Sequence, residues 1–277
     1  MGHRTKIDWC DATWNPVTGC LHGCEYCYAR KIAERFRGCI LDLVGDSVVV
    51  RDGCGKGPIY ELNNPVSKVD GIDPVLGSRV SKAPYPFSFS PTFHRYRLDI
   101  PARWTKPRTI FVCSMADLFG DWVPDEWIEQ VFKACEAAPQ HRYLFLTKNP
   151  KRYVDLYVKD ILRVHDSFWY GSTITNANDR FYYSRMPDDN PHTFCSVEPI
   201  FESIGFEPIG TMRIMPDWVI VGAETGNRKG KVVPRKEWID EIAAECKRHR
   251  KPLFMKDSLR GLMGDDFRQE LPWRAEG

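Results

Sequence analysis

Three cysteines near the start of the chain have a spacing that could hold a metal centre. Cys20, Cys24 and Cys27 form a C-x3-C-x2-C triplet, and Tyr26 stands directly before the third cysteine. Three protein thiolates suit an iron–sulfur cube better than a structural zinc ion, which normally takes four protein ligands. A cube that is held by three cysteines leaves one iron open for a ligand that is not protein. The triplet therefore predicts a [4Fe–4S] cluster with one open iron.

Two other interpretations of the triplet stay open. The thiols could belong to a zinc site that His22 or a distant cysteine completes, or they could be free thiols in the core. The flanking sequence favours the cluster, because residues 7–9 are expected to form a short strand and residues 28–36 have the apolar spacing of an amphipathic helix. The triplet then lies on a strand-to-helix loop, which in a parallel barrel is at the end where active sites lie.

The composition is that of an ordinary globular protein. The 277 residues are 43% apolar and 27% charged, and the net charge of +2 neither announces nor excludes binding to nucleic acid. No stretch approaches the roughly 20 apolar residues of a membrane-spanning helix, and the first residues lack the apolar core of a signal peptide. Ten cysteines without such a signal favour metal or redox chemistry over a disulfide framework. We therefore expect a cytoplasmic protein with no membrane contact.

Short apolar runs alternate with helical patterns after the first third of the chain. The runs have the continuous apolar character of buried parallel strands, and several segments between them have an apolar face at helical spacing. Repeated strand–helix units imply right-handed βαβ connections. We therefore expect an α/β fold with a partial or full (β/α) barrel in a single domain of residues 1–277. The expected strands are 109–113, 143–147, 168–171, 192–197, 218–221 and 252–255, and the expected helices are 124–138, 149–161 and one from residue 234.

Residues 38–106 interrupt this alternation. The segment is rich in glycine and proline, for example in Asp52-Gly-Cys-Gly-Lys-Gly57, which predicts turns and irregular structure. A long insertion after the first βα unit of a compact domain is usually functional. We interpret residues 38–106 as a lid or a substrate-binding element.

Ionisable side chains stand at the ends of the last three expected strands. They are Glu198, Glu224 and Lys256. Because unpaired charges are costly to bury, their repeated placement after apolar strands favours a functional pocket. The alternative is a structural ion-pair network, for example between Glu224 and Lys256. We predict that Glu224 and Lys256 are catalytic.

The cysteine triplet, with Tyr26 before its last member, resembles the signature of the radical S-adenosylmethionine (SAM) superfamily. The resemblance implies a barrel of the TIM-barrel-like type whose three cysteines hold a [4Fe–4S] cluster. It implies that the open iron binds the amino and carboxylate groups of SAM. An electron from the cluster then cleaves SAM to methionine and a 5′-deoxyadenosyl radical, which abstracts a hydrogen atom from the substrate. A flavodoxin- or ferredoxin-like electron donor is the implied partner.

Under this resemblance, polar residues after the expected strands would bind SAM. Asp117 stands where the superfamily has a Gly-Gly-Glu stretch for the amino group of SAM, although this chain lacks the glycines. Lys148 would pair with the carboxylate of SAM, and Ser172 and Thr173 lie at the height of the ribose. As alternatives, Asp117, Ser172 and Thr173 would cap helices, and Lys148 would be solvated. The implied cofactor-binding set is Tyr26, Ser114, Asp117, Lys148, Ser172, Thr173 and Glu198.

Four further segments resemble a narrower group of phage-associated, radical-SAM-like proteins that are often found near a "three-Cys-motif partner" protein. The segments are 93–98, 106–112, 114–120 and 218–226. This resemblance covers most of the chain, including the insertion. It implies a phage-encoded partner protein and a location in the host cytoplasm.

Basic residues interleaved with aromatic ones favour a nucleobase, nucleotide or nucleic acid as the substrate, in modification or repair. The basic residues follow or precede three of the expected strands, with Tyr96, Trp104 and Trp122 as aromatic surfaces. They are Arg95, Arg97, Arg103, Lys106 and Arg108 before the strand at 109–113, Lys151 and Arg152 after the strand at 143–147, and Arg228, Lys229, Lys231 and Arg235 after the strand at 218–221. If these side chains converge on the barrel mouth, they would neutralise phosphates and offer a stacking surface. The alternatives are solvated charges, radical SAM chemistry on a peptide or a small molecule, and a non-catalytic metal-binding module.

Overall fold

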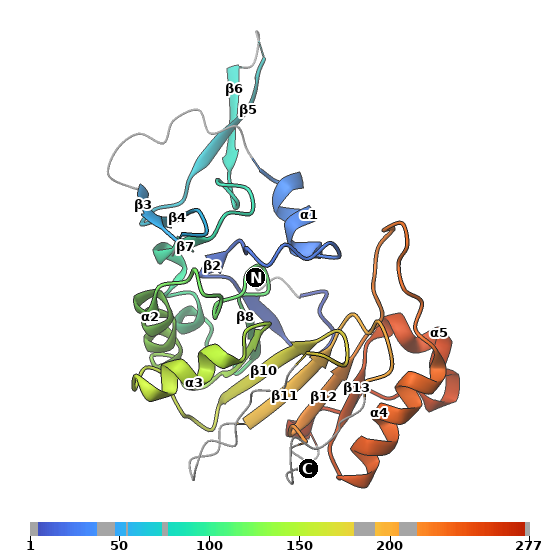
Figure 1. Cartoon of the computed structure of the whole chain (residues 1–277). Coiled ribbons are helices and arrows are strands. Elements are labelled where there is room, and N and C mark those ends of the chain that lie inside the picture. Colours follow the sequence, from blue (N-terminus) through green and yellow to red (C-terminus); the bar gives the residue numbers. More distant parts are fainter. Residues whose placement is uncertain are drawn as a thin grey trace. The chain divides into compact units, whose positions relative to one another are not determined.

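The structure is a computed structural model, which describes residues 5–37, 48–53, 55–73, 77–179, 192–204 and 215–274. The chain divides into two compact units (Figure 1). The N-terminal unit comprises Thr13–His141, and the C-terminal unit comprises Met1–Ala12 with Arg142–Gly277. The single domain expected for residues 1–277 stays a prediction.

The C-terminal unit is built on a parallel sheet. Its strands pair in chain order, β9-β10-β11-β12-β13, as expected when each strand is followed by a crossover. The helix α3 (Lys151–Val158) lies between β9 and β10 in the chain, and α4 (Lys236–Arg248) lies between β12 and β13. The strands are β9 (Arg142–Thr147), β10 (Phe168–Ile174), β11 (His192–Val197), β12 (Trp218–Val221) and β13 (Leu253–Met255).

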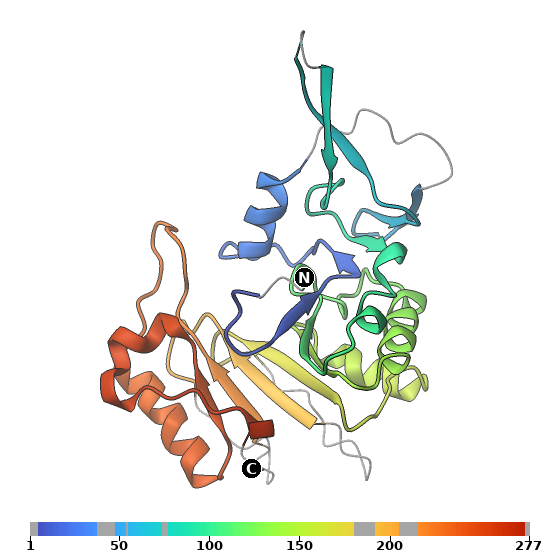
Figure 2. The same cartoon turned by 180° about the vertical axis from the view of Figure 1, so that it is seen from behind.

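The two faces of this sheet carry different side chains (Figure 2 shows the sheet from behind). On one face, residues such as Val221 form a core with Ile239 and other buried residues of α4. On the other face, the rings of Trp9, Phe194 and Trp218 lie with centroids 5.8 to 6.3 Å apart. Successive side chains of a strand point to opposite faces. The same alternation decides on which of the two faces each polar residue at a strand end lies.

Two more strands complete the hydrogen-bonded order. β1 (Ala12–Trp14) and β8 (Thr109–Val112) precede β9, so the full order is β1-β8-β9-β10-β11-β12-β13. The predicted α/β fold with a parallel sheet is confirmed, and the sheet is consistent with a partial barrel. The radical SAM type of barrel stays a prediction.

The N-terminal unit holds a second, smaller sheet of order β2-β7-β4-β3. In the same unit, the hairpin β5-β6 extends away from this sheet (Figure 1). The prediction of irregular structure at 38–106 is therefore wrong for much of the described part, because its glycines and prolines mark turns between short strands. The strands within residues 38–106 are β3 (Val48–Asp52), β4 (Pro58–Leu62), β5 (Ser67–Asp73), β6 (Gly77–Lys82) and β7 (Thr92–His94). The strand β2 (Val17–Thr18) precedes this segment.

The sequence located the later elements well and the first strand poorly. All six expected later strands are observed, as β8 to β13. The expected strand at residues 7–9 is wrong: the chain turns there, and Trp9 packs its ring against Phe194 and Trp218. The expected helices correspond to α1 (Tyr28–Arg35), α2 (Asp125–Glu136), α3 and α4.

The remaining helical segments are short. In the described part of the chain, no helix has the length and apolar character needed to cross a membrane. The short segments are η1 (Arg95–Arg97), η2 (Pro101–Arg103), η3 (Asp257–Leu259), α5 (Arg260–Met263), η4 (Gly264–Asp266) and η5 (Pro272–Arg274).

Candidate functional site

The cysteine loop (residues 19–27) connects β2 to α1 and is fixed at its start. The N–H of Gly19 donates to the carbonyl of Met115 over 2.9 Å. Gly19 has a φ of +85°, and a Cβ atom there would lie 2.2 Å from the carbonyl oxygen of Ser90. This position therefore requires glycine, both for its backbone angle and for the close approach. The loop begins from a backbone position that the neighbouring segments hold.

The three thiols of the loop influence one another. Cys20, Cys24 and Cys27 are all half-buried, and the Cys27 sulfur caps α1 by accepting the N–H of Arg30 at 3.4 Å. Burial raises the pKa of the Cys20 thiol to about 12, and the charges of Asp117 and of the other two cysteines add to this rise. A metal bound to this loop would take the thiols as thiolates, so its binding would release their protons.

Among the residues that the structure describes, no group of three or more His, Cys, Asp or Glu side chains is placed to hold a metal ion. His22, a candidate ligand of the zinc alternative, has its Nε2 atom 2.7 Å from the Oδ2 atom of Asp117. The cluster and the zinc site both stay predictions.

Four of the other five described cysteines are buried. Cys113, Cys135, Cys195 and Cys246 lie in the cores of the two units, and burial raises the pKa of each of their thiols. A buried thiol of this kind behaves as a small apolar side chain. Cys10 is half-buried, as are the three cysteines of the triplet. Cys39 and Cys54 lie outside the described residues. The triplet is thus distinguished by its spacing.

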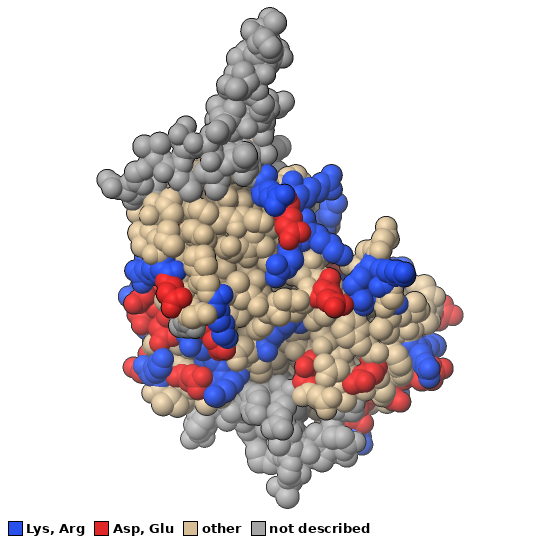
Figure 3. All heavy atoms as spheres, turned by 45° about the horizontal axis from the view of Figure 1, so that its top comes forward, with Lys and Arg blue, Asp and Glu red and all other residues tan. Residues whose placement is uncertain are grey.

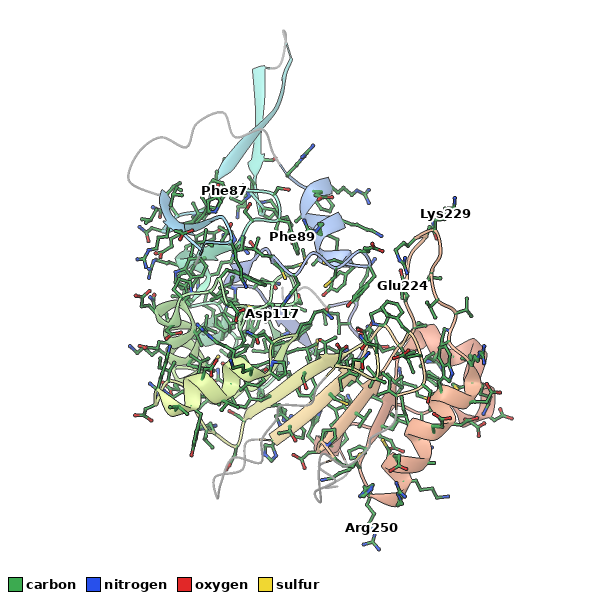
Figure 4. All side chains as sticks on the ribbon, viewed as in Figure 1. Phe87, Phe89, Asp117, Glu224, Lys229 and Arg250 are labelled. Carbon is green, nitrogen blue, oxygen red and sulfur yellow. The ribbon has the colours of Figure 1, made fainter. Side chains whose placement is uncertain are left out.

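The loop after β8 lies against the cysteine loop. The side-chain oxygen of Asn15 accepts the N–H of Met115 at 2.9 Å and the hydroxyl of Ser114 at 3.2 Å. Tyr28, the first residue of α1, donates its hydroxyl to the carbonyl of Ser114 at 2.6 Å. The structure therefore brings Ser114 and Asp117 beside the triplet (Figure 4 labels Asp117). Tyr26 is half-buried on the cysteine loop itself.

Asp117 is already engaged inside the protein. Asp117 as a whole residue is only 5% exposed. Its Oδ1 atom accepts the N–H of Phe119 at 3.0 Å, and its Oδ2 atom lies against His22. The ring of His22 in turn meets the ring of Trp122 edge-on, with centroids 4.9 Å apart. Asp117 thus accepts a backbone N–H within its own loop and contacts the cysteine loop, whereas the next helix, α2, begins at Asp125 after Pro124. His22 was considered in the sequence as a zinc ligand, and no spacing pattern marks it as the partner of Asp117.

In the C-terminal unit, polar groups gather at the ends of the strands. The Nζ atom of Lys256 lies 2.5 Å from Oε1 of Glu198. Gly222 makes room for this pair, because a Cβ atom there would lie 2.9 Å from Cδ of Lys256. Lys148 is half-buried directly after β9, and by strand alternation it shares a sheet face with Leu146. These are groups that could bind a carboxylate or an amine.

Ser172 and Thr173 point to opposite faces of the sheet, as successive residues of a strand must. Ser172 shares its face with Ile174, which belongs to the core packed against α4. The hydroxyl of Ser172 is buried and has no hydrogen-bond partner in the described part of the chain. Thr173 shares the other face with Gly171, against which the ring of Phe194 lies. Thr173 therefore lies on the sheet face that carries Phe194, and Ser172 lies on the face that packs against α4.

Glu224 is held by an arginine of its own loop. Both carboxylate oxygens accept from Arg228, at 2.7 Å from Nε and 2.8 Å from Nη2. Glu224 is 5% exposed, so this bidentate contact compensates its buried charge. The ion pairs of this region are thus Glu224 with Arg228 and Glu198 with Lys256, instead of Glu224 with Lys256. Figure 4 shows Lys229 at the tip of the same loop and Arg250 at the opposite end of the unit.

The basic residues of the chain do not form one continuous surface in the described part of the face shown in Figure 3, where lysine and arginine alternate with aspartate and glutamate. Those that precede β8 have separate partners. Arg95 contacts Glu61, Arg103 contacts Asp99, and Arg97 contacts backbone carbonyls. Binding to phosphate, if it occurs here, must therefore be local.

These features define an α/β protein with a parallel sheet and a loop of three half-buried cysteines. A family model described as "Protein of unknown function (DUF5131)" matches residues 4–68 and 72–262. Because the match covers most of the chain, the chain belongs to this family. No curated protein matches the chain, and no solved structure matches it. Because the function of this family is unknown, membership does not assign an activity to the chain.

Proposed function

We propose that the chain is a radical SAM enzyme. The observation that carries this proposal is the triplet of Cys20, Cys24 and Cys27, half-buried on one loop at the N-terminus of α1 and close enough for their charges to interact. When bound, a [4Fe–4S] cluster would supply the electron that cleaves SAM and so starts hydrogen abstraction. The phage association, the cytoplasmic location and the electron donor are parts of the same proposal.

In this proposal, residues of the N-terminal unit bind the cluster and the amino group of SAM. The three cysteines hold the cluster, and the contact between His22 and Asp117 keeps the cysteine loop against the loop after β8. Ser114, beside α1, offers a hydroxyl at the same place. The pairing of Asp117 with His22 leaves its second oxygen, Oδ1, on a backbone N–H, so an amino group of SAM would have to share these atoms.

Taken by itself, the C-terminal unit carries at its strand ends the other polar residues that the resemblance assigns to SAM or to catalysis. Lys148 and the pair of Glu198 with Lys256 provide charges of both signs for the amino-acid part of SAM or for the substrate. Thr173 provides a hydroxyl on the sheet face that carries Phe194. Glu224, predicted to be catalytic, would act while Arg228 holds its carboxylate in place on the loop after β12.

Anaerobic reconstitution with iron and sulfide tests the proposal. The reconstituted protein should gain the broad visible absorbance of a [4Fe–4S] cluster, and after reduction it should convert SAM to 5′-deoxyadenosine. Cys24→Ala should lose both properties. Cys10→Ala is the matched control, because Cys10 is another half-buried cysteine that stands outside the triplet. Tight binding of one zinc ion, with no cluster absorbance and no cleavage of SAM, would identify a non-catalytic metal-binding module instead.

For the substrate, we propose a nucleobase within a nucleotide or nucleic acid, with a peptide or a small molecule as the alternative. The arginines before β8 and the resemblance to phage-associated proteins support this choice. Incubation of the reduced enzyme and SAM with oligonucleotides, followed by mass spectrometry of the digested strands, measures it. A mass change that depends on Cys24 is the expected result, and modification of peptides alone would contradict it.

A further inference from the structure

A pocket of 510 Å³ lies within the N-terminal unit, and none of the residues assigned above to the cluster or to SAM lines it. It is formed where η1 and η2 face the end of β6 and the residues that follow β6. Its walls combine apolar surfaces with cations and one phenol. The residues that define its character are Lys82, Pro84, Tyr96, Arg97, Ile100 and Arg103.

Arg97 is held in this pocket without an acidic partner. Its Nη1 atom donates to the carbonyl of Asn15 at 3.0 Å, and its Nη2 atom donates to the carbonyl of Pro84 at 3.1 Å and to the hydroxyl of Tyr96 at 3.2 Å. Carbonyl groups orient a guanidinium but do not neutralise its charge. A guanidinium has five N–H donors, so Arg97 keeps donors for a further acceptor. In the described part of the chain, no carboxylate lies within ion-pair distance of Arg97.

The other cations of the pocket strengthen its positive charge. Lys82 is exposed at the end of β6 and forms no ion pair within the described residues. Arg103 pairs with Asp99, and both side chains are exposed, so solvent and salt compete with that pair. None of the described residues that line the pocket is acidic. An anion would therefore meet two uncompensated cations here and a third that can exchange its partner.

The neighbouring histidine does not add to this charge. His94 lies in the interior against Thr18, and burial lowers the pKa of its ring well below the ordinary value, with the positive charge of Arg97 lowering it further. His94 is therefore neutral at physiological pH. Arg97 acts on its surroundings as a fixed positive charge, which is the property a phosphate site needs.

We infer that this pocket binds a nucleotide unit through its phosphate. Lys82 and Arg97 provide charge-assisted donors for phosphate oxygens. Pro84 and Ile100 provide apolar surface that a base can contact, and the volume lies within the range of small-ligand sites, which are about 300–1,000 Å³. A free nucleotide and a nucleotide within a strand share this chemistry. The choice of a nucleotide over another phosphate ester rests on the proposed function, whereas the anion site rests on the pocket alone.

The pocket shares structural parts with the cysteine loop. Tyr85 follows the wall residue Pro84, and it packs against the same buried cluster as Cys20 and Cys27, which consists of Ala29, Ala33, Phe89 and Met115. The carbonyl of Asn15 orients Arg97, while the side chain of Asn15 holds the loop after β8. A nucleotide bound here would thus be attached to the same unit that carries the proposed cluster.

Equilibrium binding to the purified full chain, without any cluster, tests this inference. The probe is a fluorescein-labelled single-stranded decanucleotide. The competitors are the unlabelled strand, a deoxynucleoside 5′-monophosphate, the matching nucleoside, inorganic phosphate and hexaglutamate. Lys82→Gln should weaken the binding of the probe about tenfold and should lower its dependence on log salt by about one unit. Lys133→Gln, an exposed lysine of α2 outside the pocket, is the matched control and should change neither.

The outcomes separate the possibilities. Competition by the monophosphate but not by the nucleoside supports the phosphate site, and the stronger competitor between monophosphate and unlabelled strand identifies the source of the ligand. Equal weakening by Lys82→Gln and Lys133→Gln, or competition by hexaglutamate as strong as that by nucleotides, would overturn it. Arg97→Lys keeps the positive charge but loses the planar set of N–H donors of the guanidinium, so this variant should also weaken binding of the probe. Because no step requires SAM, failure here would leave the radical SAM proposal standing, and loss of SAM cleavage would leave the pocket standing.

Discussion

Arg95 and Arg97 stand two residues apart on the same short turn, η1, and the protein uses them in opposite ways. The guanidinium of Arg95 contacts the carboxylate of Glu61 through Nε and Nη2, and its Nη1 atom donates to Gln130 at 2.5 Å. The guanidinium of Arg97 contacts carbonyls and a hydroxyl. One charge is compensated within the fold, and the other is oriented and left positive.

The difference follows from what surrounds each side chain. Glu61 is 4% exposed and also accepts the indole N–H of Trp127 at 2.8 Å and lies 3.0 Å from Nε of Arg51. A buried carboxylate of this kind is tolerated because each oxygen has donors. Arg97 lies at the wall of a pocket, where solvent or a ligand can approach. Burial with partners therefore marks a structural charge, and orientation without a counter-charge marks a binding one.

The largest effect that tests this comparison is expected for Glu61→Gln. The amide can still accept from Trp127, but it leaves Arg95 without a counter-charge and Arg51 with only the exposed carboxylate of Glu126. We expect a loss of about 3–5 kcal/mol in the free energy of unfolding, as for other broken buried pairs. Urea unfolding with an unchanged slope measures it. Glu126→Gln removes the exposed partner of Arg51 and should cost less than about 1 kcal/mol; equal losses would mean that Glu61 is not a buried structural charge.

The same carboxylate should make stability depend on pH. Burial alone would raise the pKa of Glu61, but the hydrogen bonds from Trp127 and Arg95 and the charges of both arginines bring it below its ordinary value of 4.5. A lowered pKa in the folded state means that this stabilisation is fully present above pH 4.5 and is lost as the pH falls below it. The difference in unfolding free energy between the natural chain and Glu61→Gln should therefore shrink below pH 4.5. A constant difference from pH 7 to pH 3 would contradict the assignment.

The sequence predicted much of the sheet because its strands are buried on both faces. Runs such as 109–113 and 218–221 are continuously apolar, and their order in the chain is their order in the sheet. The strands of residues 38–106 were missed because they are short and partly exposed, as in β3, so they lack that signal. The cysteine triplet was recognised by spacing alone, since its members are close in the chain.

Pairing between distant residues could not be predicted in the same way. Glu61 lies 34 residues before Arg95 and 66 before Trp127, and no local pattern connects them. The stretch Arg95-Tyr96-Arg97 looks uniformly basic in sequence, although one arginine is compensated and the other is not. The pairing of His22 with Asp117 was missed for the same reason, being a contact across 95 residues. Which polar residues remain available for ligands is decided by such contacts.

A smaller effect is expected for Arg97→Lys. An ammonium group cannot donate at once to the carbonyls of Asn15 and Pro84 and to the hydroxyl of Tyr96 in the planar arrangement of a guanidinium. We expect a loss of about 1–2 kcal/mol in the free energy of unfolding, because charge-assisted hydrogen bonds are lost while the charge is kept. Thermal and urea unfolding measure it. A loss as large as that of Glu61→Gln would place Arg97 with the structural charges.

The smallest effect on the free protein is expected for Lys82→Gln, and this variant sharpens the comparison most. Lys82 is exposed and has no ion pair in the described part of the chain, so its removal should change the free energy of unfolding by less than about 0.5 kcal/mol. An anion that binds the folded pocket should raise the melting temperature of the natural chain in proportion to its concentration over Kd, and this rise should be smaller in Lys82→Gln. Differential scanning fluorimetry with the deoxynucleoside 5′-monophosphate, at constant ionic strength, measures both quantities. A large loss without ligand would mean that Lys82 is structural, and an equal rise in both proteins would mean that the anion binds elsewhere. The expected pattern, little change without ligand and a reduced response to it, is the opposite of that for Glu61, whose charge matters to the fold before any ligand arrives.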